Sequence, residues 1–190
     1  MVLVEYPGYG TSQGRASADG IDRHVKAAFQ HFYETLGIPA SRFVLFGCSV
    51  GTGPAAALAS RVPGIGALIL QSPYKSIRDA AAHIAGWLAY LIWERWDNAA
   101  ALSALACPVL VIHGTKDEVI PFSHGQELVR QRTQAGLPVT LHAQAGGSHN
   151  QFRGKEDLSE PVAAFLQREH PQGSALVTRT AGGVRSWGSK

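Results

Sequence analysis

The stretch Phe43-Val44-Leu45-Phe46-Gly47-Cys48-Ser49-Val50-Gly51 decides how this chain folds. An apolar run leads into the pattern Gly-x-Ser-x-Gly, and the Ala-rich segment Pro54–Ala59 follows it. A buried strand, a sharp turn and a helix in this order are typical of a nucleophile elbow, which holds a serine at the apex of the turn. The flanking glycines leave room where the strand and helix backbones converge. The helix N-terminus favours negative charge beside the serine, so we predict that Ser49 is a nucleophile.

Short apolar runs alternate with segments of helical periodicity along most of the chain. Such alternation predicts an α/β fold, with a mostly parallel sheet and helices on both of its faces. The segment 74–106 interrupts the pattern with helical sequence and no strand, and we interpret it as a small cap insertion. The expected strands cover residues 2–6, 42–46, 67–70, 108–112 and 139–142, and the expected helices roughly 17–36, 54–61, 123–135 and 157–167.

The composition indicates one soluble domain, which we place at residues 1–167. The segment 168–190 is rich in Gly, Ser, Thr and Arg, and we predict that it is a disordered tail. The net charge is +3, but the basic residues are scattered and indicate no nucleic-acid partner. Two cysteines favour a reducing, cytoplasmic setting, and no Cys or His spacing indicates zinc. We therefore expect neither a metal nor another cofactor.

A serine nucleophile needs a base within hydrogen-bonding reach and a carboxylate that orients the base. In this fold the three follow the order Ser, Asp or Glu, His, each in a loop after a strand. Asp117 lies just past the fourth expected strand, and His149 lies just past the fifth, in a glycine-rich loop. We therefore predict a triad of Ser49, Asp117 and His149. The N–H of Val50, directly after the nucleophile, is the expected oxyanion donor.

Other residues near these motifs could compete for the same roles. Glu118 neighbours Asp117, but adjacent loop residues point in different directions, and we favour the aspartate. His113 ends an apolar strand, which favours a place beneath the site rather than in it. Cys48 flanks the apex of the elbow without occupying it, so a cysteine nucleophile is not expected.

Aromatic residues are concentrated in the cap insertion, where three tryptophans fall between Trp87 and Trp96. One interpretation is that this segment packs its aromatic side chains onto the edge of the sheet. The other is that it forms an apolar wall over the serine, or a surface that touches a membrane. On the second interpretation, Tyr9, Trp87 and Leu91 are candidate substrate-binding residues.

Five stretches of the sequence carry a resemblance to a known family: Glu5-Tyr6-Pro7-Gly8-Tyr9-Gly10, Gly47–Pro54, Leu70-Gln71-Ser72-Pro73, Cys107–Gly125 and Gly147-Ser148-His149-Asn150. Together they resemble the α/β-hydrolase superfamily, its serine aminopeptidase-like group, and in particular the α/β-hydrolase domain-containing 17 protein depalmitoylases. The resemblance covers about residues 2–167. It implies Ser49 as nucleophile, Asp117 as orienting acid and His149 as base. It also implies acyl ester or thioester substrates, including S-palmitoyl groups on proteins, and a cytoplasmic site of action with peripheral membrane contact.

The chain departs from this family at its start. In the family, earlier strands and a His-Gly loop that donates a second oxyanion N–H precede the strand that matches residues 2–6. We expect an N-terminally truncated hydrolase domain; a reduced protein of doubtful activity is the alternative. The family's cysteine-rich, palmitoylated N-terminus has no counterpart either. The function expected first is therefore a serine hydrolase of acyl esters or thioesters. The alternatives are a non-catalytic remnant that binds lipid or protein, and a serine peptidase.

Overall fold

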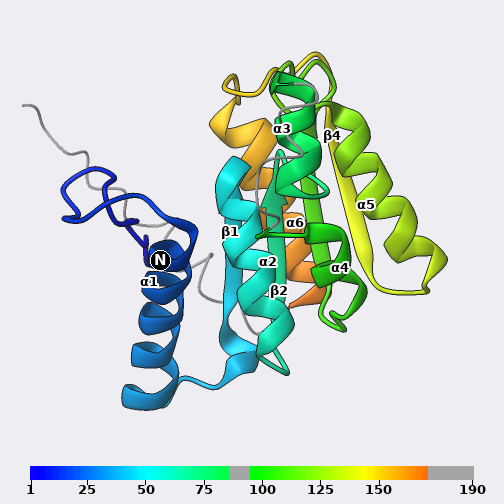
Figure 1. Ribbon diagram of the computed structural model, residues 1–190. Helices are drawn as coiled ribbons and strands as arrows, with labels where there is room; N and C mark the ends of the chain where they lie inside the picture. The colour runs from blue at the N-terminus through cyan, green and yellow to red at the C-terminus, as the bar shows by residue number, and fades with distance from the viewer. Residues whose placement is uncertain (86–94, 171–190) are drawn as a thin grey trace, which may run out of the picture.

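A computed structural model describes residues 1–85 and 95–170 of the chain. Its centre is a four-stranded sheet in which all neighbouring strands are parallel and the spatial order β1-β2-β3-β4 follows the sequence (Figure 1). Parallel neighbours need a crossover between consecutive strands, and helices provide it here. The strands are β1 (Val44–Cys48), β2 (Ala67–Gln71), β3 (Val109–Gly114) and β4 (Val139–Gln144).

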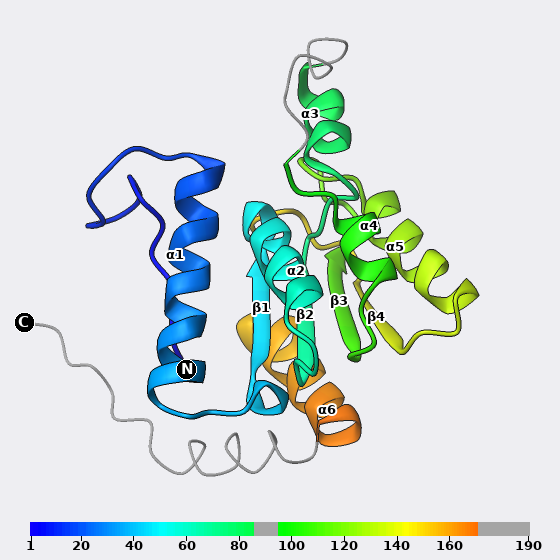
Figure 2. The ribbon, with the colours of Figure 1, turned by 60° about the horizontal axis from the view of Figure 1, so that its bottom comes forward.

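Helices cover both faces of this sheet, which confirms the predicted α/β class (Figure 2). The helices α2, α4 and α5 pack on one face, and α6 packs on the other. The described helices are α1 (Ala18–Gln30), α2 (Thr52–Arg61), α3 (Ile77–Ala85), α4 (Asn98–Ser103), α5 (Phe122–Gln134) and α6 (Glu160–Glu169). Short π-helical segments continue α1 over His31–Thr35 and precede α6 over Gly154–Ser159.

The two central strands are buried along their whole length, as their apolar runs predict. Alternate side chains point to opposite faces, so one strand serves two cores. On one face Leu68, Leu70, Val109 and Val111 meet α2, α4 and α5. On the other face Ile69, Leu110 and Ile112 meet Phe165 and Leu166 of α6. The carboxyl ends of the strands are thereby held rigidly beside one another.

The predicted strand at residues 2–6 is wrong for this structure. Residues 2–6 carry no strand pairing, and the side chains of Val2 and Leu3 are 57% and 83% exposed. An open apolar groove of about 720 Å³ separates this segment and α1 from β1. Among the described residues, only β2 pairs with β1, on one side. A β-branched run becomes a strand only where a neighbouring strand satisfies its backbone, and no strand of the described residues pairs with residues 2–6.

The end of the last helix also differs from the prediction. The last helix reaches Glu169, and His170 is buried with its Nε2 2.6 Å from the Ser41 carbonyl oxygen, so the ordered domain runs past residue 167. The cap insertion contains α3 and α4. Residues 86–94 of the cap and residues 171–190 of the predicted tail lie outside the described part of the chain.

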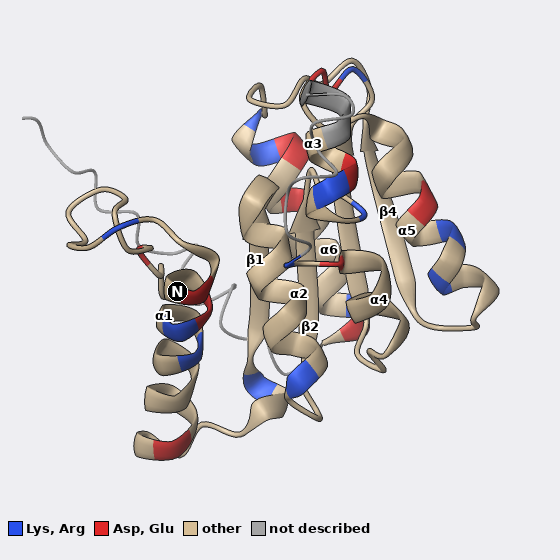
Figure 3. Cartoon of the chain, viewed as in Figure 1, with Lys and Arg blue, Asp and Glu red and all other residues tan. Residues whose placement is uncertain are grey.

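Acidic and basic positions are interspersed along the helices and loops rather than separated by sign (Figure 3). Basic and acidic residues lie side by side on α5, where Arg130 pairs with Glu127 at 2.6 Å. In the described ranges, no helix is both long enough and apolar enough to cross a bilayer.

Candidate active site

Ser49 lies at the sharp turn between β1 and α2. Its φ of 51° is left-handed, a conformation that costs a residue with a Cβ about 1–2 kcal/mol. Gly47 permits this turn, because a Cβ added there would lie 2.5 Å from the Gly51 carbonyl oxygen. The Thr52 hydroxyl donates to the Ser49 carbonyl oxygen at 2.7 Å and fixes the first turn of α2. The strand, sharp turn and helix expected of a nucleophile elbow are therefore present, and strain of this kind gathers at functional sites.

The structure brings Ser49, His149 and Asp117 together from three different loops. The Ser49 Oγ lies 2.9 Å from His149 Nε2, and His149 Nδ1 lies 2.8 Å from Asp117 Oδ2. Because a carboxylate only accepts hydrogen bonds, the Nδ1–H of His149 donates to Asp117. The Nε2 lone pair then faces the Ser49 hydroxyl and can accept its proton. This is the geometry that general-base activation of a serine requires.

The electrostatics of Asp117 suit the orienting role. Its side chain is fully buried, and its Oδ1 accepts the N–H groups of Val119 and Ile120 at 3.0 and 2.8 Å. Burial alone would raise the pKa of this carboxyl, but the Ile120 N–H, His149 and Ser72 outweigh it and the pKa is lowered. The Ser72 hydroxyl has no partner within hydrogen-bonding distance in the described residues, yet it lies close enough to add to this lowering. Asp117 is therefore ionised at neutral pH.

The rival residues take other positions. The Glu118 carboxylate lies 3.5 Å from the backbone N of His149 and makes no described bond to the imidazole. His113 is completely buried beneath Asp117, as its place at the end of an apolar strand predicts. Cys48 is exposed, but partial desolvation of its thiol and the nearby charge of Asp117 raise the thiol pKa, which disfavours the reactive thiolate.

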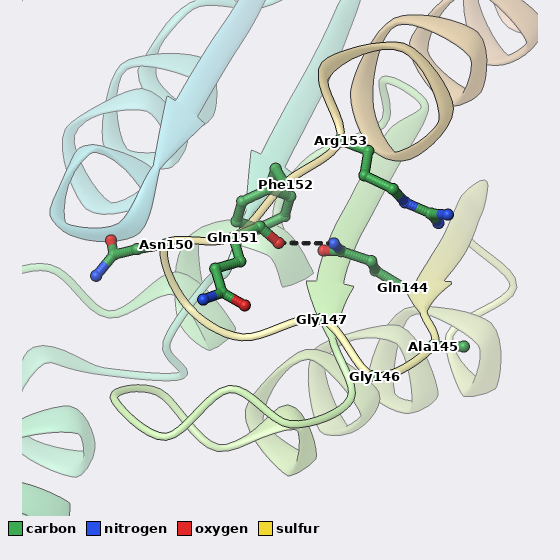
Figure 4. A pocket seen from close by; sticks show the side chains of 8 residues that line it. All are labelled: Gln144, Ala145, Gly146, Gly147, Asn150, Gln151, Phe152 and Arg153. Atoms are coloured by element: carbon green, nitrogen blue, oxygen red, sulfur yellow. Dashed lines mark hydrogen bonds between the residues drawn. The ribbon is translucent and has the colours of Figure 1, made fainter.

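The loop that carries His149 is held by Gln144 at the end of β4 (Figure 4). The Gln144 Nε2 donates to the Gln151 carbonyl oxygen and to Asp157 Oδ2, both at 2.8 Å. Asp157 also pairs with Arg153 at 2.8 Å, and this contact, with the Arg153 backbone N–H and nearby charges, outweighs the effect of burial and lowers the pKa of Asp157 to about 2. A small open hollow of about 430 Å³ lies along this loop. The network fixes both ends of the loop and so fixes the imidazole.

A second network supports the elbow from the cap side. The Tyr74 hydroxyl donates to the Val50 carbonyl oxygen at 3.3 Å, and the Asn98 Nδ2 donates to Thr52 Oγ1 at 3.1 Å. Trp96, 6% exposed, donates from Nε1 to Asp22 of α1 at 2.9 Å. Sequence reasoning missed these supports because each joins residues far apart in the chain. Their signal in the sequence is faint, as polar residues within otherwise apolar segments.

The other predicted site residues are less closely tied to the triad. Val50 follows the nucleophile in the short turn Ser49–Gly51, where its N–H remains the predicted oxyanion donor. Tyr9 lies in an exposed turn and packs edge-to-face on Tyr6, with ring centroids 6.1 Å apart. Trp87 and Leu91 lie outside the described residues. The described residues contain no group of three or more His, Cys, Asp or Glu side chains that could hold a metal ion.

Most of the chain is similar in sequence to curated proteins. The chain is similar to the Caenorhabditis elegans protein "Alpha/beta hydrolase domain-containing protein aho-3", with 32% identity over 165 residues. It is also similar to the human "Alpha/beta hydrolase domain-containing protein 17C", with 33% identity over 168 residues. These alignments cover 87% and 88% of the chain but only 48% and 49% of the relatives. The chain thus spans about half the length of the curated relatives that it matches.

Solved structures show the same fold at low sequence identity. The Pyrococcus furiosus esterase Pf2001 superposes with a TM-score of 0.68 and 18% identity, over 86% of this chain and 67% of the esterase. A puromycin-hydrolysing peptidase of Mycobacterium tuberculosis superposes with a TM-score of 0.64 and 16% identity, over 79% of this chain and 25% of the peptidase. Residues 75–171, just over half of the chain, match the sequence profile of the prolyl oligopeptidase family. The chain therefore belongs to the prolyl oligopeptidase family and has part of an α/β-hydrolase domain as its fold.

Proposed function

We propose that this chain is the catalytic part of a serine hydrolase that cleaves acyl esters and thioesters through an acyl-serine intermediate. The observation that carries the proposal is the hydrogen-bonded chain from Ser49 through His149 to Asp117, at 2.9 and 2.8 Å. Three side chains from separate loops meet in the protonation pattern that activates a serine. Packing alone would not require that arrangement.

The proposed reaction has two stages. Ser49 Oγ attacks the acyl carbon while His149 Nε2 takes the hydroxyl proton, and the Val50 N–H stabilises the oxyanion. The bond to the leaving alcohol or thiol breaks, and His149 returns the proton to the leaving group. A water molecule, deprotonated by His149, then attacks the acyl carbon; the bond to Ser49 Oγ breaks, His149 returns the proton to this oxygen, and the carboxylic acid leaves. Asp117 stays ionised throughout and stabilises the imidazolium.

The substrate class is the narrower part of the proposal. The proposed substrates are a small acyl ester or an acylated protein, with S-palmitoyl cysteine as the protein-bound thioester, reached by peripheral membrane contact on the cytoplasmic side. Support comes from the resemblance to the domain-containing 17 proteins and from the fold shared with an esterase. Membership of the prolyl oligopeptidase family favours amide cleavage as a second candidate.

A comparison of substrates decides between the two candidates. Purified chain is assayed with p-nitrophenyl esters of rising acyl length, an S-palmitoyl peptide and aminoacyl p-nitroanilides, with Ser49→Ala as the control. We expect ester and thioester turnover to exceed anilide turnover by at least about 100-fold in kcat/KM, a difference of about 3 kcal/mol in transition-state stabilisation. Faster turnover of the anilides would establish the peptidase. Turnover of none of them, together with binding to liposomes, would favour the non-catalytic lipid-binding alternative.

A further inference from the structure

His113 is a polar side chain in an apolar place. It is the penultimate residue of β3, is completely buried, and packs edge-to-face against Phe122, with ring centroids 5.6 Å apart. Gly125 of α5 lies against the other side of the ring, where an added Cβ would come within 2.5 Å of His113 Nδ1. Burying an imidazole is unfavourable unless its N–H groups are bonded. The hydrogen bonds that His113 makes therefore indicate which role a histidine has at this position.

The neighbours of His113 fix its tautomer. Its Nε2 lies 2.9 Å from the Ile120 carbonyl oxygen and 3.5 Å from Asp117 Oδ2, and both of these atoms only accept hydrogen bonds. The proton must therefore be on Nε2. The Nδ1 has no hydrogen-bond partner among the described residues, and burial lowers the pKa of the ring, so His113 is neutral. The Nε2–H dipole then points at the carbonyl and the carboxylate together.

The Nε2–H of His113 completes a set of hydrogen bonds around the turn that carries Asp117. The Ile120 N–H donates to Asp117 Oδ1, while the Ile120 carbonyl oxygen accepts from His113. The peptide groups on both sides of Ile120 are thus held, one by the carboxylate and one by the imidazole below. The strand β3, buried along its length, anchors the imidazole. The position of the Asp117 carboxylate therefore depends on the rigid core of the sheet through His113.

We propose that His113 is a positioning residue, whose Nε2–H holds the Asp117 turn so that the carboxylate keeps the hydrogen bond that orients His149. This inference rests on the triad mechanism proposed above. A displacement of about 1 Å in such a relay costs on the order of 10²-fold in rate. His113 touches no reacting atom, so its loss reduces kcat and leaves KM nearly unchanged.

Side-chain replacements at this position separate the hydrogen bond from the volume. In His113→Leu the donor is lost, and we expect kcat for a p-nitrophenyl ester to fall about 10–100-fold with KM within twofold. In His113→Gln the side-chain amide replaces the Nε2–H, and kcat returns to within about fivefold of wild type. Gly125→Ala keeps the imidazole but displaces it, and it lowers kcat in the same way. The matched control is His142→Leu on β4, which leaves kcat unchanged.

Hydrogen exchange tests the same inference without turnover. We expect the Val119 and Ile120 amides to exchange about tenfold faster or more in His113→Leu, corrected for global unfolding, and the Gln variant to restore their protection. Unchanged exchange, or a kcat within threefold of wild type in an active His113→Leu enzyme, overturns the inference. A wild-type chain without hydrolase activity would overturn the proposed function, while altered exchange would still support the role of His113.

Discussion

Replacement of Asp117 by Asn tests the proton relay more sharply than removal of the side chain. The Asn oxygen can still accept the Val119 and Ile120 N–H groups that now reach Oδ1 at 3.0 and 2.8 Å, so the fold is expected to survive. These two bonds force the new NH₂ group into the place of Oδ2, which lies 2.8 Å from His149 Nδ1. The new NH₂ group and the Nδ1–H of His149 would then be two donors that face each other.

The oxygen at the Oδ1 position lies 3.0 Å from His149 Nδ1 but already accepts two backbone N–H groups, so we expect the imidazole to relieve the closer donor–donor contact by changing its tautomer. With the lone pair on Nδ1, the proton moves to Nε2, which lies 2.9 Å from the Ser49 Oγ. The Ser49 hydroxyl then meets a donor and loses its base, and the negative charge that stabilises the imidazolium is gone as well. We expect kcat to fall about 10⁴-fold, which corresponds to about 5 kcal/mol in the barrier.

The assay is the steady-state hydrolysis of a short p-nitrophenyl ester at pH 7–8, with the melting temperature measured by circular dichroism. The matched control is Glu118→Gln, which neutralises the adjacent carboxylate; that carboxylate reaches only the backbone N of His149, at 3.5 Å. We expect the control to retain activity within threefold. A folded Asp117→Asn variant within tenfold of wild type, or an equal loss in the control, would refute the relay.

Three further predictions concern stability. Arg132 is buried and donates to four carbonyl oxygens, two of them fully buried. Arg132→Met should therefore lower the free energy of unfolding by about 4 kcal/mol in urea denaturation, and Arg132→Lys should lower it by less. A loss below about 1 kcal/mol in Arg132→Met would contradict this. Arg153 is the main cause that lowers the pKa of Asp157 from its ordinary value of 3.8 to about 2. The ionised Asp157 therefore stabilises the folded state fully above pH 4, and this contribution disappears as the pH falls toward 2. The gap in unfolding free energy between wild type and Asp157→Asn should therefore close over that window, and a gap that persists at pH 2 would exclude the linkage. Trp96→Phe removes the bond to Asp22 and should cost about 2 kcal/mol, whereas an unchanged denaturation midpoint would show that the bond contributes nothing.

Much of the fold could be predicted from the sequence, because the patterns that determine it are local. The apolar runs that became β2 and β3 are buried on both faces, and the Gly-x-Ser-x-Gly turn needs Gly47 for a steric reason visible in the sequence. The segment 2–6 shows the limit of such reasoning. Its composition favours a strand, but strand formation depends on a partner elsewhere in the fold, which a local pattern cannot supply.

The candidate site likewise contains residues that the sequence could predict and residues that it could not. Ser49, Asp117 and His149 could be named because each follows a strand in the order that the fold demands. The roles of Ser72 and His113 around Asp117 could not be predicted, because they depend on which side chains the turn beyond β3 brings into contact. Asn98, which joins the cap to the first turn of α2, was likewise hidden, since its partner lies 46 residues away in the sequence.

The labelling of Ser49 by a fluorophosphonate probe tests the central claim most directly. The probe reacts with a serine only when a base activates it. Mass spectrometry of the labelled and digested chain should place a single adduct on Ser49, and Ser49→Ala, with an unchanged melting temperature, should remain unlabelled. A folded wild-type chain that takes up no probe, or that carries the adduct on another residue, would contradict the account.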